Sequence, residues 1–164
     1  MQLEEYRNLV EMAFKIREWN YSREDYEEKS VFSINFLENG QMHTNCKVRV
    51  FDDGICDMEA VFPFECAPDD MEELSCIIAD YNFEKRYATI RLDSSDGEIM
   101  NSYSFDIMPS MSPEFILLKF LAVADIEADI YQAIEKLCKS KEEKRETIEI
   151  SIPSGKKDEF MIDL

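Results

Sequence analysis

The stretch 78–99 carries the residues whose types and spacing are best suited to chemistry. It brings Asn82, Arg91 and Asp93 close together in sequence. Amide, guanidinium and carboxylate groups at such spacing could form a catalytic cluster or part of a calcium site. The run 93–98 (DSSDGE) has the composition of a calcium loop, but its ligand spacing is wrong, because an EF-hand alternates its ligands before the glycine and needs a Glu about six residues beyond it. We therefore interpret the stretch as a structural joint.

Histidine and cysteine chemistry is also poorly supported. The single histidine, His43, has no nominated partner for proton transfer. Cys46 is expected on the opposite strand face from His43, which disfavours a Cys–His nucleophile. The five cysteines lie at 46, 56, 66, 76 and 138, without a CxxC pair. An odd number with this spacing fits neither a disulfide framework nor a zinc site, so we expect reduced, mostly buried thiols.

No phosphate-binding or hydrolase motif occurs, and a chain with four glycines has little material for a phosphate cradle. The sequence thus nominates no catalytic, cofactor-binding or metal-ligating residue. It leaves the protein-binding residues undetermined. We expect a protein that is not an enzyme and needs no cofactor.

The charge restricts the class of partner. Eighteen Lys and Arg stand against 36 Asp and Glu, for a net charge of −18. Such a chain is unsuited to nucleic acid or to an anionic membrane surface. Eleven acidic residues and no basic one occur between Val50 and Glu84. This run predicts either a solvated acidic face or a docking surface for a basic segment of another protein.

The N-terminal residues contain acids and no long apolar run, unlike a secretory signal. No stretch approaches the roughly 20 apolar residues of a membrane span. We expect a cytoplasmic protein.

The elements that would position these residues follow from periodicity and turn chemistry. Asn39-Gly40, Asp53-Gly54 and Asp96-Gly97 are typical of hairpin turns. Ser112-Pro113 is typical of a helix start. The expected order is helix 2–18, connector 19–30, strands 31–37, 42–51 and 55–62, a helix from 68 to about 82, strands 86–93 and 99–105, and a long helix 113–138.

This order, α-β-β-β-α-β-β-α, predicts an α+β fold. Five antiparallel strands would form one sheet with the helices packed on one face. The long helix is apolar on more than one side near 115–123, so we expect the first helix or a second subunit to cover it.

Residues 1–139 are predicted to form the domain and 140–164 a charged tail. The tail contains one alternating segment, 147–152. It could be disordered, add one strand to the sheet, or bind a partner.

Over roughly residues 1–138, this order of elements resembles the YbjN-like bacterial family, which shares its small α+β fold with type III secretion chaperones. The resemblance lies in IIADYNFE (77–84), YATIRLD (87–93), SSDGEI (94–99) and SPEFILLKFLA (112–122). It implies a chaperone-like or adaptor-like domain, often dimeric and acidic, and brings no catalytic residues with it.

We therefore expect a non-enzymatic module that binds a protein or peptide partner and forms a homodimer. The alternatives are a self-associating regulatory or structural domain and, less favoured, a small-ligand-binding protein.

Overall fold

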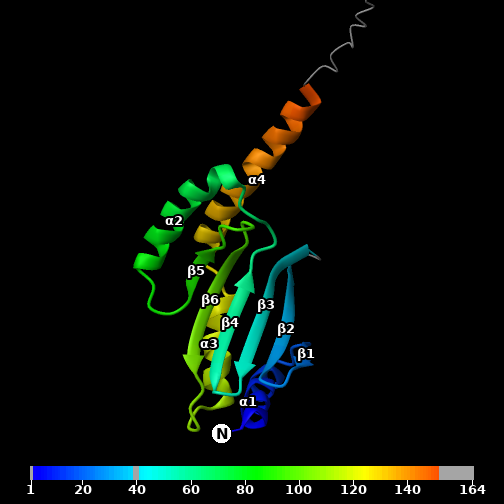
Figure 1. The fold of residues 1–164 in the computed structure, drawn as a ribbon, viewed down its shortest axis with the longest axis vertical. Coiled ribbons are helices and arrows are strands. Elements are labelled where there is room, and N and C mark those ends of the chain that lie inside the picture. The colour runs from blue at the N-terminus through cyan, green and yellow to red at the C-terminus, as the bar shows by residue number, and fades with distance from the viewer. Residues whose placement is uncertain (1, 39–40, 152–164) are drawn as a thin grey trace, which may run out of the picture.

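The computed structural model describes residues 2–38 and 41–151, apart from the side chains of 37–38, 41–43 and 140–151. Figure 1 shows the arrangement of the elements. Their order is α1 (Leu3–Ile16), β1 (Ser22–Asp25), β2 (Lys29–Glu38), β3 (Gln41–Phe51), β4 (Ile55–Val61), the short 3-10 turn η1 (Pro68–Asp70), α2 (Met71–Phe83), β5 (Thr89–Leu92), β6 (Ile99–Asp106), α3 (Pro113–Ala124) and α4 (Ala128–Ser151). None of these helices is long and apolar enough to cross a membrane.

The predicted α+β class is confirmed. All neighbouring strands pair antiparallel, in the order β1-β2-β3-β4-β6-β5. The sheet has six strands rather than the predicted five, because β1 forms within the segment 19–30 that the sequence assigned to a connector.

Strand β1 could not be predicted from the hydrophobic pattern, because it has no apolar face. Ion pairs hold it in place instead. Its sequence is SRED, and most of its residues are exposed. Arg23 donates to Glu11 of α1 at 2.6 Å and to Asp25 at 2.8 Å. Arg7 of α1 donates to the buried hydroxyl of Ser30, which in turn donates to Asp25. The network joins α1 to the edge of the sheet.

The predicted alternation in the central strands is correct. Cys46, Val48 and Val50 of β3 are buried. Their partners across the ladder, from β4, are Ala60, Met58 and Cys56, which are buried too. Gly54 has φ +91° in the β3–β4 turn, and Gly97 has φ +84° before β6, so both predicted turns use glycine where a side chain would be strained. Residues 39 and 40 of the first predicted turn lie outside the described residues.

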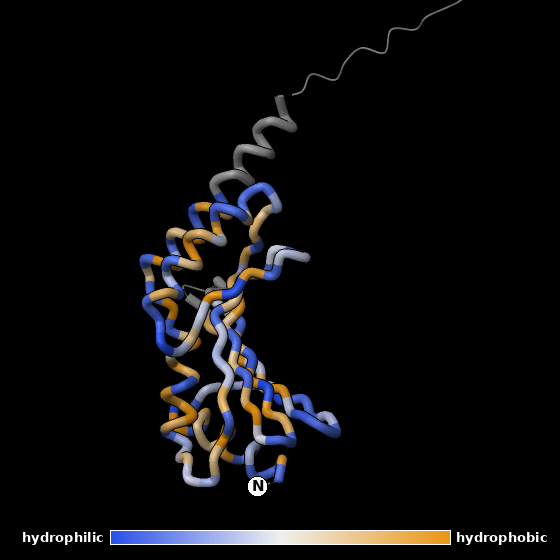
Figure 2. Tube along the Cα trace, turned by 60° about the vertical axis from the view of Figure 1, so that its left-hand side comes forward, coloured by the Kyte–Doolittle hydropathy of each residue, from blue (hydrophilic) through white to orange (hydrophobic). Residues whose placement is uncertain are grey.

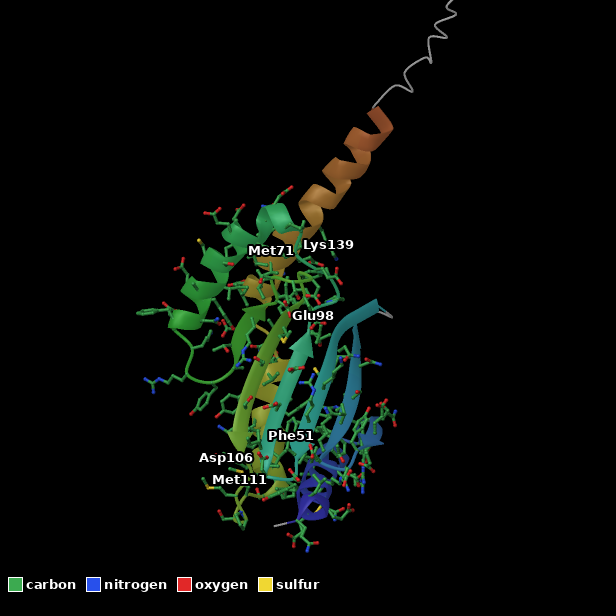
Figure 3. The ribbon with its side chains drawn as sticks, in the orientation of Figure 1. Phe51, Met71, Glu98, Asp106, Met111 and Lys139 are labelled. Carbon is green, nitrogen blue, oxygen red and sulfur yellow. The ribbon has the colours of Figure 1, made fainter. Side chains whose placement is uncertain are left out.

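Helices α1 and α3 cover the apolar face of the sheet, and they pack against each other (Figure 1). Phe14 of α1 and Phe120 of α3 meet at 5.2 Å between ring centroids, and Phe14 also contacts Phe32 of β2. The other face of the sheet is turned toward the viewer in Figure 3. The labels Glu98, just before β6, and Asp106, its last residue, mark the two ends of that strand.

The predicted long helix 113–138 is wrong, since the chain forms two helices separated at 125–127. The amide of Asn101, buried in β6, donates to the carbonyl oxygen of Val123 at 2.8 Å. In an unbroken helix that carbonyl would accept from the amide four residues later. The side chain therefore supplies a partner that lets α3 end, and α4 turns away from it.

The part of the tail that the structure describes is helical. Helix α4 continues through residues 140–151, across the proposed domain limit at 139. The division into domain and tail stays a prediction.

Asn82 connects α2 to the sheet edge. Its amide donates to the carbonyl oxygen of Ile90 at 2.8 Å, and its side-chain oxygen accepts from the Ile90 amide at 2.9 Å. Strand β5 is an edge strand, so these groups would otherwise be unpaired and open to another chain. The Asn82 side chain thus makes the two hydrogen bonds that a neighbouring strand would make with Ile90, and it holds α2 beside β5.

We predict that Asn82→Ala lowers the free energy of unfolding by about 1–3 kcal/mol, because it leaves two half-buried backbone groups without partners. Asn82→Asp keeps the acceptor and should cost less. The measurement is urea unfolding followed by the fluorescence of Trp19, with the exposed Asn20→Ala as the control. Equal stability of Asn82→Ala and the control would contradict this role.

The β1 network predicts a dependence on acid. The Arg23 guanidinium, with help from Ser30, lowers the pKa of Asp25 from 3.8 to about 2. Because the folded-state pKa is the lower one, this stabilisation is complete above the ordinary pKa and is lost as the pH falls from 3.8 towards 2. The effect should be small, since the Asp25 side chain is 45% exposed.

In unfolding curves measured across that pH range, Asp25→Asn should show a shallower loss of stability than the wild type. Asp80→Asn, at an exposed position, should follow the wild-type curve. Parallel curves for Asp25→Asn and the wild type would rule out the network as a source of acid sensitivity.

Candidate functional site

The polar residues of the stretch 78–99 do not form a site. Asn82 is held by Ile90, whereas Arg91 is exposed on the uncovered face of β5, as the alternation predicts. Asp93 accepts from the amide and hydroxyl of Ser95 at 2.8 and 2.6 Å, and these bonds lower the pKa of its carboxyl group. The interpretation as a structural joint is correct.

The turn that ends this stretch is fixed by close packing. Asp96 accepts from the amide of Glu98, and the Cys66 amide donates to the Gly97 carbonyl oxygen at 2.8 Å. A Cβ atom at Gly97 would lie 2.2 Å from the Cys66 carbonyl oxygen. The Asp93 and Asp96 carboxylates of the apparent calcium loop are therefore committed to the turn.

The thiols behave as small apolar groups. None of the five cysteines forms a disulfide, and four are buried, while Cys76 is exposed on α2. Burial raises the pKa of Cys46 to about 12 and raises the pKa of Cys56 as well, so neither thiol is a nucleophile at neutral pH. The side chain of His43 lies outside the described part, and no group of metal-ligating residues occurs in the parts described.

The acidic run from Val50 to Glu84 does not make one face. Its members lie in the β3–β4 turn, on the uncovered face of β4, between β4 and α2, and along and just after α2. On β4, Glu59 accepts from Arg49 at 2.6 Å, which raises the pKa of the guanidinium. The acids are therefore distributed over separate surfaces, most of them exposed.

Among the described elements no helix covers the other face of the sheet (Figure 1), and its polar side chains can remain in contact with water. Register places Ser33, Lys47, Glu59, Ser102 and Thr89 in one row across the strands. A hollow of about 280 Å³ lies apart from this row. It is lined by Tyr26, Glu27, Glu28, Lys29 and Phe51. Its volume is at the lower limit for ligand pockets.

The feature that stands out is a set of exposed apolar side chains on α3 and at the connection from α2 to β5. We call Phe83, Tyr87, Phe115 and Leu118 the apolar patch. Phe83 is 91% exposed, Leu118 62%, Tyr87 59% and Phe115 38%. Phe115 and Leu118 are three residues apart on α3 and share one side of the helix. Phe83 is the last residue of α2, and Tyr87 lies in the segment 84–88 between α2 and β5. Figure 2 colours α3 as hydrophobic over most of its length.

Lys119 links these elements. Its ammonium lies 4.4 Å from the ring centroid of Tyr87 and 5.0 Å from those of Phe115 and Tyr103. The hydroxyl of Tyr103 is 3.5 Å from the same nitrogen. Cation–π attraction thus holds side chains from α3, β6 and the α2–β5 segment together. Among the described residues Lys119 forms no ion pair.

The sequence indicated part of this surface. The expectation that the first helix covers one side of 115–123 is correct, since Leu117 and Phe120 are buried on the side of α3 that meets α1 and the sheet. Leu118 lies on another side of the helix and is exposed, and the expected cover by a second subunit stays a prediction. Phe83 and Tyr87 were missed, because nothing local distinguishes an exposed aromatic at a helix end from a buried one.

Comparison with known proteins supports the fold. No family model matches the chain, and no curated protein matches it in sequence. Among solved structures, YbjN from E. coli, described as a proposed transcription regulator, superposes with a TM-score of 0.52 at 10% identity. The match covers 85% of this chain and 93% of that chain. The YbjN-like fold implied by the sequence resemblance is therefore confirmed, and at this identity the likeness concerns the fold alone.

If the apolar patch serves binding rather than folding, its residues are dispensable for stability. We predict that Phe83→Ser and Leu118→Ser change the free energy of unfolding by no more than about 0.5 kcal/mol. Phe120→Ala, at a position 1% exposed, should cost about 3–5 kcal/mol. Urea unfolding of the three variants tests this. A loss of several kcal/mol in Leu118→Ser would assign that residue to the core instead.

Proposed function

We propose that this protein is a non-enzymatic protein-binding module, chaperone-like or adaptor-like, that holds a partner protein at the apolar patch. The observation that carries the proposal is the exposure of Phe83 and Leu118, at 91% and 62%. Exposed large apolar side chains that lie together, as Tyr87 and Phe115 do around Lys119, are typical of protein interaction sites. Their exposure costs solubility and gains nothing in the folded monomer, so a partner gives it a physical reason.

The composition of the surface supports this proposal. Aromatic side chains and arginine dominate the binding energy of protein interfaces. Phe83, Tyr87 and the exposed Arg86 lie in one short segment. Lys85 of the same segment is already paired with Glu127. A partner would therefore meet rings and one uncommitted guanidinium rather than a purely acidic surface.

The net charge limits what a regulatory role could involve. YbjN is described as a proposed transcription regulator. For the present chain, a charge of −18 disfavours direct contact with DNA phosphates. A role in regulation would act through bound proteins. Five cysteines without a disulfide are consistent with a reducing cytoplasmic location, which we include in the proposal.

A self-associating domain is the second candidate, and one specific observation favours it. Helix α3 contains one acid and one base between Pro113 and Ala124, in a chain of net charge −18. It is thus a surface where two copies could meet without strong repulsion.

The proposed function is tested by photocrosslinking in cells of the source organism. A photoreactive amino acid replaces Phe83 or Tyr87 in the full chain, and the controls carry it at the exposed positions Glu65 and Asp53. We expect a discrete adduct with a different protein from the patch positions alone. The adduct from Tyr87 should weaken when Phe83→Ser is added. Identical adducts from patch and control positions, or none, would refute the proposal.

A further inference from the structure

We propose that a second copy of this chain covers the exposed side of α3, with the two α3 helices parallel about a twofold axis. This inference rests on the proposed function only in treating the apolar patch as a protein-binding surface. It assigns the α3 half of the patch to self-association and leaves Phe83 for another partner.

The exposed side of α3 has the spacing of an interhelical seam. Phe115, Leu118 and Ala122 are exposed and follow one another at intervals of three and four residues. The opposite side holds Ile116 and Phe120, which are buried against the sheet and α1. The helix is therefore apolar on both sides, and only one side has a partner within the chain.

Written as a heptad, these residues define an orientation. Phe115 falls at a, Leu118 at d and Ala122 at the next a, while Glu114 falls at g and Lys119 at e. In a parallel pair the g residue of one helix meets the e residue of the other across the seam, and such charges select partner and orientation. Glu114 and Lys119 have this relation, five residues apart along the chain.

An antiparallel pair would not use these charges. There, g residues meet g residues and e residues meet e residues, so Glu114 and Lys119 would lie on opposite flanks. Neither side chain forms an ion pair among the described residues, and the rings and hydroxyl that Lys119 contacts leave its positive charge unneutralised. The parallel arrangement gives Glu114 and Lys119 of the two copies two symmetric partners.

The charge of the rest of the chain makes this side favourable for a second copy. Two chains of −18 repel wherever acidic surfaces meet. At α3 the seam carries one charge of each sign, so self-association there places opposite charges together. Exposed apolar side chains on neighbouring elements, Tyr87 and the α1 residues Met12 and Ile16, can extend the contact beyond one short helix. Such an extension is needed, because stable interfaces bury about 1,200–2,000 Å² in total.

The test exchanges the two charges. Glu114→Lys and Lys119→Glu each place like charges together across the seam, so each should weaken dimerisation of the full chain at least about tenfold. The double variant carrying both substitutions restores opposite charges and should dimerise as the wild type does. An equimolar mixture of the two single variants should form a heterodimer. Sedimentation velocity over a concentration series measures all four.

Matched controls are Glu65→Lys and Lys136→Glu, which make the same changes at exposed positions away from α3. Circular dichroism melting checks that every variant is folded. A monomeric wild type throughout the series would overturn the inference, as would a double variant no tighter than the single ones. Single variants that dimerise as tightly as the wild type would place the dimer interface elsewhere and would also overturn the inference.

These outcomes separate the inference from the proposed function. A monomeric wild type that still gives a specific adduct from Phe83 overturns the dimer and keeps the binding module. A dimer with rescue by charge exchange, but with adducts only between copies, supports the dimer and refutes the binding module.

Discussion

The contact between Phe14 and Phe120 determines which side of α3 is buried in this fold. It joins the two helices that cover the sheet, with ring centroids 5.2 Å apart, and around it lie Trp19 and Phe36. A two-layer fold offers α3 only one side for burial, against α1 and the strands. Since α3 is apolar over more than that side, the part it cannot bury becomes surface. The apolar patch is thus a consequence of the architecture acting on this helix sequence.

The parts of the fold that could be predicted are those where local chemistry decides. The glycines at 54 and 97 adopt the positive φ angles that their turns require, and the alternation along β3 and β4 identifies the inner face. The parts that could not be predicted depend on a distant partner. The end of α3 requires Asn101 on β6, and β1 requires Glu11 on α1. Neither partner is visible from the residues around the element itself.

The same division applies to the candidate site. The apolar excess of α3 can be read from the sequence, and so can the absence of familiar catalytic motifs. The exposure of Phe83 depends on where the α2–β5 segment points, and that direction is set by the bonds between Asn82 and Ile90. Lys119 gathers rings from three elements, which no spacing along the chain reveals. The stretch that looked chemical in sequence therefore acts by positioning the surface beside it.

Charge connects the two roles proposed for that surface. Acids scattered over the turn, the uncovered sheet face and α2 give the chain a long-range negative field, and salt screens it beyond about 8 Å at physiological ionic strength. Which surfaces can bind at α3 is then determined by the charges within that distance, and there the opposite charges of Glu114 and Lys119 cancel. A dimer formed there would combine two acidic surfaces into one stronger field. Such a field would attract a basic partner to the outer faces while the neutral seam stays closed to it.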